Sequence, residues 1–251
     1  MSASELAAVL NKARTGRTAI APLTDEWPDL DLPTAYEVQR LLRAEAGDLV
    51  GWKLGVTSRA KQVQVGVPEP IRGFLATDHV LDLGEPLMVH EHIAPRCEPE
   101  IVFVMGADLS GAHVTAAQVL ASTAAVAVGI EVLDSRYRGY RFTMPDVVAD
   151  NASAGRFVIG TPMPLGFDLA KVGVVFEQNG EVVATASGAA SLGHPAAAVA
   201  WLVRDLARVG GGLHPGDVIL SGGLTAAFPV APGDCVLATI DRIGSVELAC
   251  R

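Results

Sequence analysis

Short apolar runs separated by glycine, proline and aspartate dominate the chain from residue 50 onward, and they constrain its fold more than any other feature. Runs of this length, bounded by turn-forming residues, are typical of β-strands. Seven strands are predicted, at 100–105, 156–160, 172–177, 181–186, 217–220, 235–240 and 245–249. Gln178-Asn179-Gly180 is typical of a hairpin turn. Two Pro-Gly-Asp triplets, at 215–217 and 232–234, each precede a predicted strand.

Two helices are predicted near the N-terminus. Ser2 and Glu5 have the spacing of a capping box, and an amphipathic pattern follows them. Thr34 and Glu37 repeat this spacing, and their helix should stop at Gly47. Residues 15–33 are rich in turn formers and are predicted to be loop. The two helices predict a small N-terminal subdomain over residues 1–49.

The remainder, residues 50–251, contains only two further predicted helices. One begins at Thr115 and is expected to continue through an alanine- and valine-rich stretch to about residue 128. The other follows Pro195 and ends at the glycines 210–212, with His194 as a candidate cap. Because predicted strands outnumber helices, we expect an α+β catalytic domain built on a mixed sheet or roll.

Composition and charge argue against several classes of protein. A formal net charge of −9 and a pI of about 5.1 argue against nucleic acid as a partner, since phosphate binding needs clustered lysine and arginine. No apolar run approaches the ~20 residues of a membrane span, and residues 1–16 lack the apolar region of a secretory signal. Cys97, Cys235 and Cys250 have unrelated spacings and indicate reduced thiols. We therefore expect a cytoplasmic protein.

Glu98 and Glu100 stand at the start of an apolar strand. Side chains alternate along a strand, so both carboxylates should point to one face, ~7 Å apart. A solvated strand end would explain them without any ligand. Glu131 favours a different explanation, because it lies in an apolar stretch where a lone carboxylate would be costly. Three converging carboxylates would suit Mg²⁺, and a buried Glu–Arg pair is the alternative.

Three other segments are candidates for binding. Lys53 lies between apolar residues and two glycines, so its ammonium group either enters a pocket or reaches solvent along the strand. Residues 150–153 form either an Asx-type turn or a substrate-binding loop. The glycine-rich stretch 221–225 either presents backbone N–H groups to an anion or makes a tight turn.

Several of these segments together resemble the hydratase/decarboxylase branch of the fumarylacetoacetate hydrolase superfamily. The matching motifs are Gly-Trp-Lys-Leu-Gly-Val-Thr-Ser at 51–58, Pro-Arg-Cys-Glu-Pro-Glu at 95–100 and Glu-Val-Leu-Asp-Ser-Arg at 131–136. Val-Val-Ala-Asp-Asn-Ala-Ser at 147–153, Leu-Gly-His-Pro at 192–195 and Gly-Gly-Leu-Thr at 222–225 continue the match. Their order agrees over nearly the whole chain.

The resemblance implies a mixed-sheet roll over residues 50–251 and a set of site residues. It implies that Glu98, Glu100 and Glu131 bind Mg²⁺ or Mn²⁺, and that Lys53 acts as the catalytic cation. We expect substrate contacts from residues in or near the same motifs: Leu54, Ile71, Phe74, Ser153 and Thr225. The implied substrate is a small 2-oxo dicarboxylic acid.

The segment around Ile71 favours decarboxylation over hydration. Hydratases of this branch usually carry an aspartate in a Pro-Asp-Phe-Gly segment, and here the corresponding stretch reads Pro-Ile-Arg-Gly-Phe-Leu. Ile71 cannot act as a general base, so a hydratase would need another base, such as Asp78 or Asp150. We expect decarboxylation of 2-oxo-3-hexenedioate to 2-hydroxypenta-2,4-dienoate in the meta-cleavage breakdown of aromatic compounds. Hydration of 2-hydroxypenta-2,4-dienoate is the alternative.

The resemblance also bears on partners. It implies a homo-oligomer, which can form a complex with the hydratase of the same pathway. Two other roles compete with the lyase activities: a carbon–carbon hydrolase of the wider superfamily, and a non-catalytic subunit of that hydratase. An intact set of three metal-binding carboxylates argues against the non-catalytic role.

Overall fold

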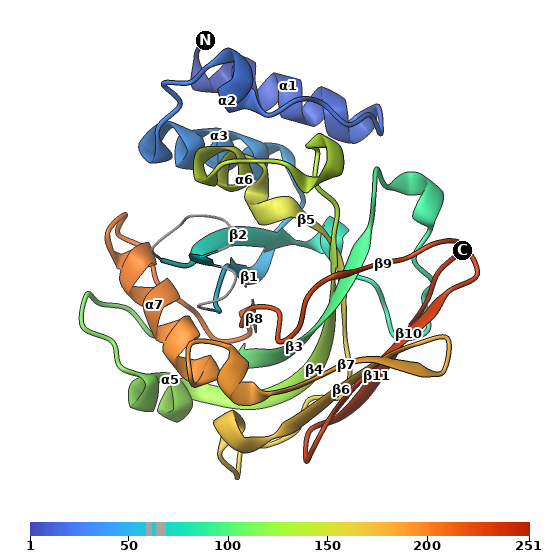
Figure 1. Cartoon of the computed structure of the whole chain (residues 1–251). Helices are drawn as coiled ribbons and strands as arrows, with labels where there is room; N and C mark the ends of the chain where they lie inside the picture. Colours follow the sequence, from blue (N-terminus) through green and yellow to red (C-terminus); the bar gives the residue numbers. More distant parts are fainter. Residues whose placement is uncertain (59–61, 64–68) are drawn as a thin grey trace.

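The computed structural model describes residues 1–58, 62–63 and 69–251. A curled mixed sheet forms the centre of the molecule (Figure 1). The N-terminal helices lie on one side of it and a second sheet lies on the opposite side. This arrangement confirms the predicted α+β fold with a mixed sheet and N-terminal helices. None of the helices in the described part of the chain is long and apolar enough to cross a membrane.

The larger sheet has the strand order β2-β1-β8-β3-β4-β5, with β9 paired to β3. Strands β1 and β8 are parallel, and the other pairings in this sheet are antiparallel. Strand β2 lies at one edge. The bounds are β1 Leu49–Gly55, β2 Ile71–Ala76, β3 Arg96–Met105, β4 Thr123–Leu133, β5 Ala154–Ile159, β8 Val218–Leu220 and β9 Phe228–Pro229.

The smaller sheet is antiparallel and has the order β11-β10-β6-β7. Its strands are β6 Gly173–Gln178, β7 Glu181–Ser187, β10 Cys235–Ile240 and β11 Gly244–Ala249. The predicted hairpin joins β6 to β7. Asn179 and Gly180 both have positive φ, 57° and 80°, as a type I′ turn requires. Strands β10 and β11 contact β4, so the two sheets share one core.

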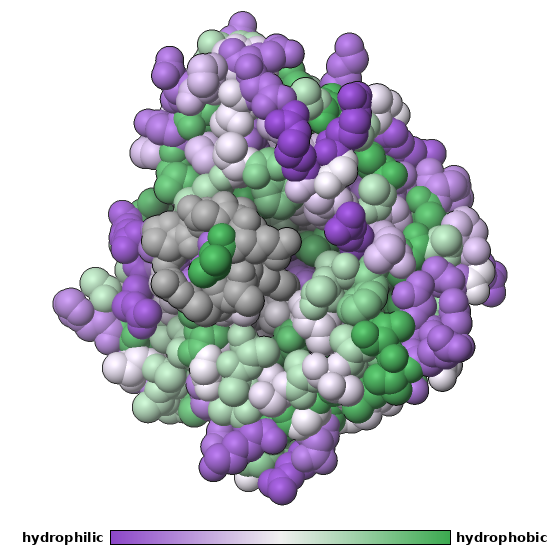
Figure 2. All heavy atoms as spheres, viewed as in Figure 1, coloured by the Kyte–Doolittle hydropathy of each residue, from purple (hydrophilic) through white to green (hydrophobic). Residues whose placement is uncertain are grey.

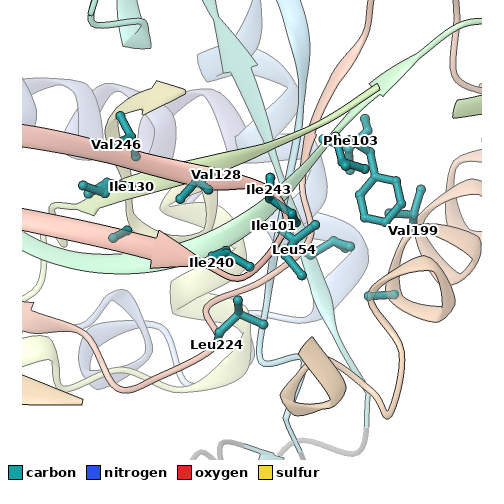
Figure 3. Packing of buried hydrophobic residues seen from close by; sticks show 14 of the residues in the cluster. Leu54, Ile101, Phe103, Val128, Ile130, Val199, Leu224, Ile240, Ile243 and Val246 are labelled. Carbon is teal, nitrogen blue, oxygen red and sulfur yellow. The ribbon is translucent and has the colours of Figure 1, made fainter. Parts of the chain in front are cut away.

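That core is the largest apolar cluster of the molecule. Figure 3 shows Ile101 and Val128 of the larger sheet together with Ile240 and Val246 of the smaller one. Helix α7 (Pro195–Ala207) closes the core on another side, where its Val199 lies near Phe103. The side chain of His194 caps this helix, as predicted, by accepting a hydrogen bond of 3.1 Å from the Ala196 N–H.

A second apolar cluster holds the N-terminal helices against the sheet. Helices α1 (Ala3–Thr15), α2 (Leu23–Glu26) and α3 (Leu32–Glu45) share it with α6 (Met144–Ala149) and with Ile71 of β2. Hydrophilic residues gather over the N-terminal helices and at the opposite end of the molecule, with more apolar surface between (Figure 2). The apolar faces of the helices therefore point inward. The domain boundary after residue 49 stays a prediction.

Several predicted elements differ in the structure. The helix from Thr115 is wrong beyond residue 122, since α5 covers Ala116–Ser122 and residues 123–128 belong to β4. Pairing with β3 and β5 outweighs the helix propensity of the alanines there. Helix α3 is capped by Asp31 rather than Thr34, and Glu37 pairs instead with Arg40. In the described part of the chain, the predictions also missed the helices α2 and α6 and the strands β1, β2 and β9.

Candidate active site

Antiparallel pairing of β3 and β4 brings the three predicted carboxylates together. Glu98 lies directly opposite Glu131 in the register, and Glu100 follows on the same face of β3. One oxygen from each of the three lies within 4.8 Å of the others. Their exposed fractions are 4%, 0% and 1% for Glu98, Glu100 and Glu131. A solvated strand end is thereby excluded, and the alternative of a buried Glu–Arg pair also fails, because the cation beside Glu131 is a lysine.

The cluster carries an excess of negative charge. Burial raises the pKa of Glu100 well above its usual value, and the neighbouring Glu131 and Glu98 raise it further. Burial likewise raises the pKa of Glu131, against the effect of Lys53. Among the described residues, no donor reaches Glu100 Oε1 or Glu131 Oε2 with a hydrogen bond. Buried acceptors of this kind suit a divalent cation bound by oxygen ligands.

Lys53 of strand β1 supplies a positive charge to the cluster. It is 1% exposed, and its Nζ lies 2.6 Å from Glu131 Oε1. Nζ also donates a hydrogen bond of 2.8 Å to the Ala152 carbonyl. The ammonium group therefore points into the protein and does not reach along the strand to solvent, which decides between the two alternatives for Lys53.

The glycine-rich segment after β8 closes the cluster from the other side. The Gly222 N–H donates a hydrogen bond of 2.6 Å to Glu100 Oε2. At Gly223, a Cβ atom would lie only 2.1 Å from Glu98 Cδ, so any larger residue would displace the Glu98 carboxylate. The segment does present an N–H to an anion, and that anion is a carboxylate of the protein itself.

A cleft of about 770 Å³ opens onto the cluster. Lys53 and Glu98 line it, and Arg96 and Arg141 add two more cations to its lining. Much of the remaining lining is apolar. The apolar side chains are Val56, Ile71, Leu133, Phe142, Val147, Ala152, Ala190, Leu224, Ala226 and Ala227. Cationic groups beside an apolar wall suit a small, partly apolar anion.

Two of the five predicted substrate contacts have side chains away from this cleft. Ile71, Ser153 and Thr225 line it. Leu54 follows Lys53 on β1 and points to the opposite face, where it belongs to the main core (Figure 3). Phe74 lies opposite Trp52 in the β1–β2 register and stacks on His79, with ring centroids 5.7 Å apart. Strand alternation accounts for both positions. Lys53 and Gly73 are paired and share one face of the sheet, so the next residue on each strand, Leu54 or Phe74, points to the other face.

Some cleft residues were not predicted. Arg96 stands two residues before Glu98, so the same alternation could have placed it on the face of the carboxylates. Its guanidinium lies 4.1 Å from the ring centroid of Tyr140, another lining residue. Tyr140 ends a short 3-10 helix, Arg138–Tyr140, and Phe142 follows it; no sequence motif pointed to this segment between β4 and α6.

The two candidate bases of a hydratase lie away from the cleft. Asp78 and Asp150 border a separate, small cavity. Asp150 is fully buried and pairs with the guanidinium of Arg136. Burial raises its pKa to about 6, although Arg136 favours the charged form. Within the described residues that line the cleft, Glu98 is the only carboxylate.

Comparisons with known proteins agree with this architecture. The model of the fumarylacetoacetate (FAA) hydrolase C-terminal family matches residues 48–250. A 4-oxalocrotonate decarboxylase from Pseudomonas sp. (strain CF600) is 43% identical over 234 residues, which cover 91% of this chain and 89% of that protein. A 2-keto-4-pentenoate hydratase from Burkholderia vietnamiensis (strain G4) is 39% identical over 252 residues, covering 98% and 96%.

A solved structure extends the likeness to three dimensions. The 4-oxalocrotonate decarboxylase from Pseudomonas putida G7, complexed with magnesium and adipate, is 39% identical and superposes with a TM-score of 0.94, covering 99% of this chain and 97% of that one. The family match spans both sheets and every residue of the carboxylate cluster. The chain therefore belongs to the fumarylacetoacetate hydrolase family.

Proposed function

We propose that this protein decarboxylates 2-oxo-3-hexenedioate to 2-hydroxypenta-2,4-dienoate and CO₂, with Mg²⁺ or Mn²⁺ as cofactor. The observation that carries the proposal is Ile71 in the cleft that contains Lys53 and Glu98, where a hydratase would need a base. Decarboxylation needs no such base. The relatives of this protein at about 40% sequence identity include both decarboxylases and hydratases of 2-oxo acids. Hydration is therefore the second candidate.

The residues present fit the proposed metal. Glu98, Glu100 and Glu131 offer three converging carboxylates, and two of their buried oxygens accept no hydrogen bond from the described residues. These three would hold the ion. When bound, it would act as a Lewis acid toward the carboxylate and oxo oxygens of the substrate. The magnesium in the related decarboxylase structure supports this assignment.

The side chains around the cluster would orient the substrate. The Lys53 ammonium makes two contacts, to Glu131 and to the Ala152 carbonyl, and an ammonium group has three donors. We infer that the third N–H serves the 2-oxo oxygen. The Ser153 Oγ is buried, lines the cleft and has no hydrogen-bond partner among the described residues. It can donate a hydrogen bond to the adjacent carboxylate of the substrate.

The bond changes balance with one proton, taken from water, as the only further reactant. The bond between C5 and the distal carboxylate breaks, and CO₂ leaves. Its electron pair forms a C4–C5 double bond, the C3–C4 pair moves to C2–C3, and the 2-oxo oxygen becomes negatively charged. Lys53 is placed to stabilise that oxygen, which then takes a proton to give the 2-hydroxy product.

The apolar wall favours this direction of reaction. Ile71, Phe142 and Val147 line the cleft together with Leu133 and Leu224. A carboxylate held against such a surface is poorly solvated, whereas CO₂ is neutral, so the wall favours the product. The related structure holds adipate, a saturated dicarboxylate with the same number of carbon atoms as the proposed substrate.

The proposal is tested by giving the purified protein each of the two substrates with Mg²⁺. We expect CO₂ from 2-oxo-3-hexenedioate and little hydration of 2-hydroxypenta-2,4-dienoate. In the Ile71→Asp variant, decarboxylation should fall, because a negative charge would then stand near the departing carboxylate. Efficient hydration by the wild-type protein, without CO₂ release, would transfer the assignment to the hydratase.

Two statements about partners are proposals of the same kind. We propose that the chain forms a homo-oligomer and that this oligomer can associate with the hydratase that would consume its product. Sedimentation of the protein alone, and then mixed with that hydratase, tests both.

A further inference from the structure

Three consecutive residues beside the cleft have a left-handed backbone. Asn151, Ala152 and Ser153 have φ values of 50°, 51° and 57°. Single residues adopt this conformation, asparagine most readily, but a run of three is costly for L-amino acids. Such a turn persists only where its surroundings over-determine it. This turn directs the Ala152 carbonyl to Lys53 Nζ and brings Ser153 to the cleft.

The Asn151 carboxamide fastens the first residue of the turn to strand β2. The Phe74 N–H donates to Asn151 Oδ1 at 2.8 Å, and Asn151 Nδ2 donates to the Phe74 carbonyl at 3.0 Å. Since β2 is an edge strand, the outward backbone groups of Phe74 need partners that the sheet does not supply. One amide side chain satisfies both groups, as an additional strand would.

Gly73 allows the turn to approach this closely. A Cβ atom at Gly73 would lie 2.7 Å from the Asn151 carbonyl oxygen and 3.0 Å from Lys53 Cγ. Gly73 also pairs with Lys53 across the β1–β2 register. The turn, the edge strand and the lysine are thus in mutual contact at one point.

The ends of the turn are held separately. Arg136 donates to the carbonyl of Asp150 and to that of Ala154, one on each side of the turn. The Asp134 N–H donates to the Ser153 carbonyl at 2.8 Å. These bonds tie the turn to the segment after β4, whereas Asn151 ties it to β2 and therefore to β1, which carries Lys53.

We propose that Asn151 is a positioning residue, which sets the Lys53 ammonium and the Ser153 hydroxyl by clamping this turn to β2. The inference rests on the proposed use of Lys53 and is the same for decarboxylation and hydration. Asn151 itself lies outside the set of described residues that line the cleft. It acts through the Ala152 carbonyl.

Two variants at this position and one control test the proposal. Asn151→Gly keeps the left-handed backbone accessible and removes the clamp. Asn151→Asp keeps the shape and one acceptor but sets an oxygen against the Phe74 carbonyl. Gln39→Met is the control, because the Gln39 amide is also buried and also links β2 to the segment before the turn, by donating to the carbonyls of Arg72 and Val148, neither of which belongs to the turn. The measurements are kcat and KM on the substrate that the wild-type protein converts, and hydrogen exchange of the Phe74 amide.

We expect kcat to fall by about 10- to 100-fold in both Asn151 variants, the size of effect that a misplacement of about 1 Å produces. KM should change much less, the Phe74 amide should exchange faster, and Gln39→Met should keep its kcat. If Asn151→Gly does not fold, the kcat of Asn151→Asp alone tests the proposal. Wild-type kcat in Asn151→Asp, or an equal loss of kcat in Gln39→Met, would overturn the proposal. A wild-type protein inactive on both substrates would instead count against the proposed function.

Discussion

At the scale of single residues, alternation along a strand decides which side chains reach the site. It correctly placed Glu98 and Glu100 on one face, and the cost of a lone carboxylate among apolar residues correctly drew attention to Glu131. The same rule separates Leu54 from its neighbour Lys53. That separation was predictable only once β1 was known to be a strand, and the sequence motif alone had no such information.

Replacing Lys53 by methionine tests the role of the ammonium group. The apolar stem remains, but the donor to the 2-oxo oxygen is lost, so kcat should fall by about 10²- to 10³-fold. The free energy of unfolding should change little with saturating Mg²⁺ and fall clearly in chelator, where Glu131 would be buried without its cation. Steady-state kinetics and urea unfolding in both buffers measure these effects. A variant within about twofold of the wild-type kcat would contradict the assignment.

At the scale of elements, the strands of the smaller sheet were predictable because each is short, apolar and bounded by turn residues. Strand β4 was mistaken for the end of a helix, since alanine favours helices in isolation. Its conformation depends on β3 and β5, which are distant in the sequence. Helix α2 was missed for a related reason, because only four residues form it and tertiary contacts hold it.

Helix α2 holds one rim of the cleft. The carboxylate of Asp146 in α6 is fully buried and accepts hydrogen bonds from the backbone N–H and hydroxyl groups of Thr24 and Thr143. The exposed ion pair of Asp25 and Arg141 makes a second link between α2 and the segment before α6. The segment so attached contributes Tyr140, Arg141, Phe142 and Val147 to the lining.

Asp146→Ala would leave the two backbone N–H groups without acceptors. We expect the free energy of unfolding to fall by about 2–4 kcal/mol and KM to rise as the rim loses its support. Asp25→Ala is the matched control, which breaks only the exposed link and should leave both quantities almost unchanged. Urea unfolding and kinetics compare the two. Equal effects in both variants would show that the buried carboxylate is not the main attachment.

At the scale of the whole molecule, the cleft exists only where distant segments meet: strands β1, β2 and β3, the segment before α6, and the glycine-rich exit from β8. Most of these segments could be identified from the sequence, because they carry the motifs that resemble the family. The size of the cleft and its apolar wall could not be read from any one of them. They depend on how these segments pack together. Ile71, Val147 and Ala152 of the wall belong to the second apolar cluster, which the N-terminal helices share.

The stability of the whole protein should depend on pH through His79. Burial lowers the pKa of its imidazole from 6.5 to about 4, and the ring stacks on Phe74 while Nδ1 accepts a hydrogen bond from the Ala76 N–H. Between about pH 6.5 and 4, the unfolded chain binds a proton at this residue that the folded protein does not bind. The contribution of His79 to stability is therefore complete above pH 6.5 and is lost as the pH falls. Asp150, whose pKa is raised to about 6, acts in the opposite sense between about pH 6 and 4.

The variant His79→Asn separates the pH dependence that comes from His79 from the one that comes from Asp150. The amide can accept the same hydrogen bond and does not titrate. Between pH 7 and pH 5, the wild-type protein should lose about 1–2 kcal/mol of unfolding free energy relative to this variant. Urea unfolding of both proteins at the two pH values gives the difference. Parallel pH dependences would show that His79 is equally basic in the folded and unfolded states.

The measurement that tests the central claim most directly is release of CO₂ from 2-oxo-3-hexenedioate by the purified protein, with Mg²⁺ and after removal of divalent cations. We predict CO₂ and 2-hydroxypenta-2,4-dienoate in equal amounts when Mg²⁺ is present, and almost none without it. Glu100→Gln, measured beside the wild-type protein, should stay inactive at Mg²⁺ concentrations that saturate the wild type, because it lacks one of the three carboxylates. Undiminished CO₂ release by the cation-free protein, or no CO₂ at any Mg²⁺ concentration, would contradict the account.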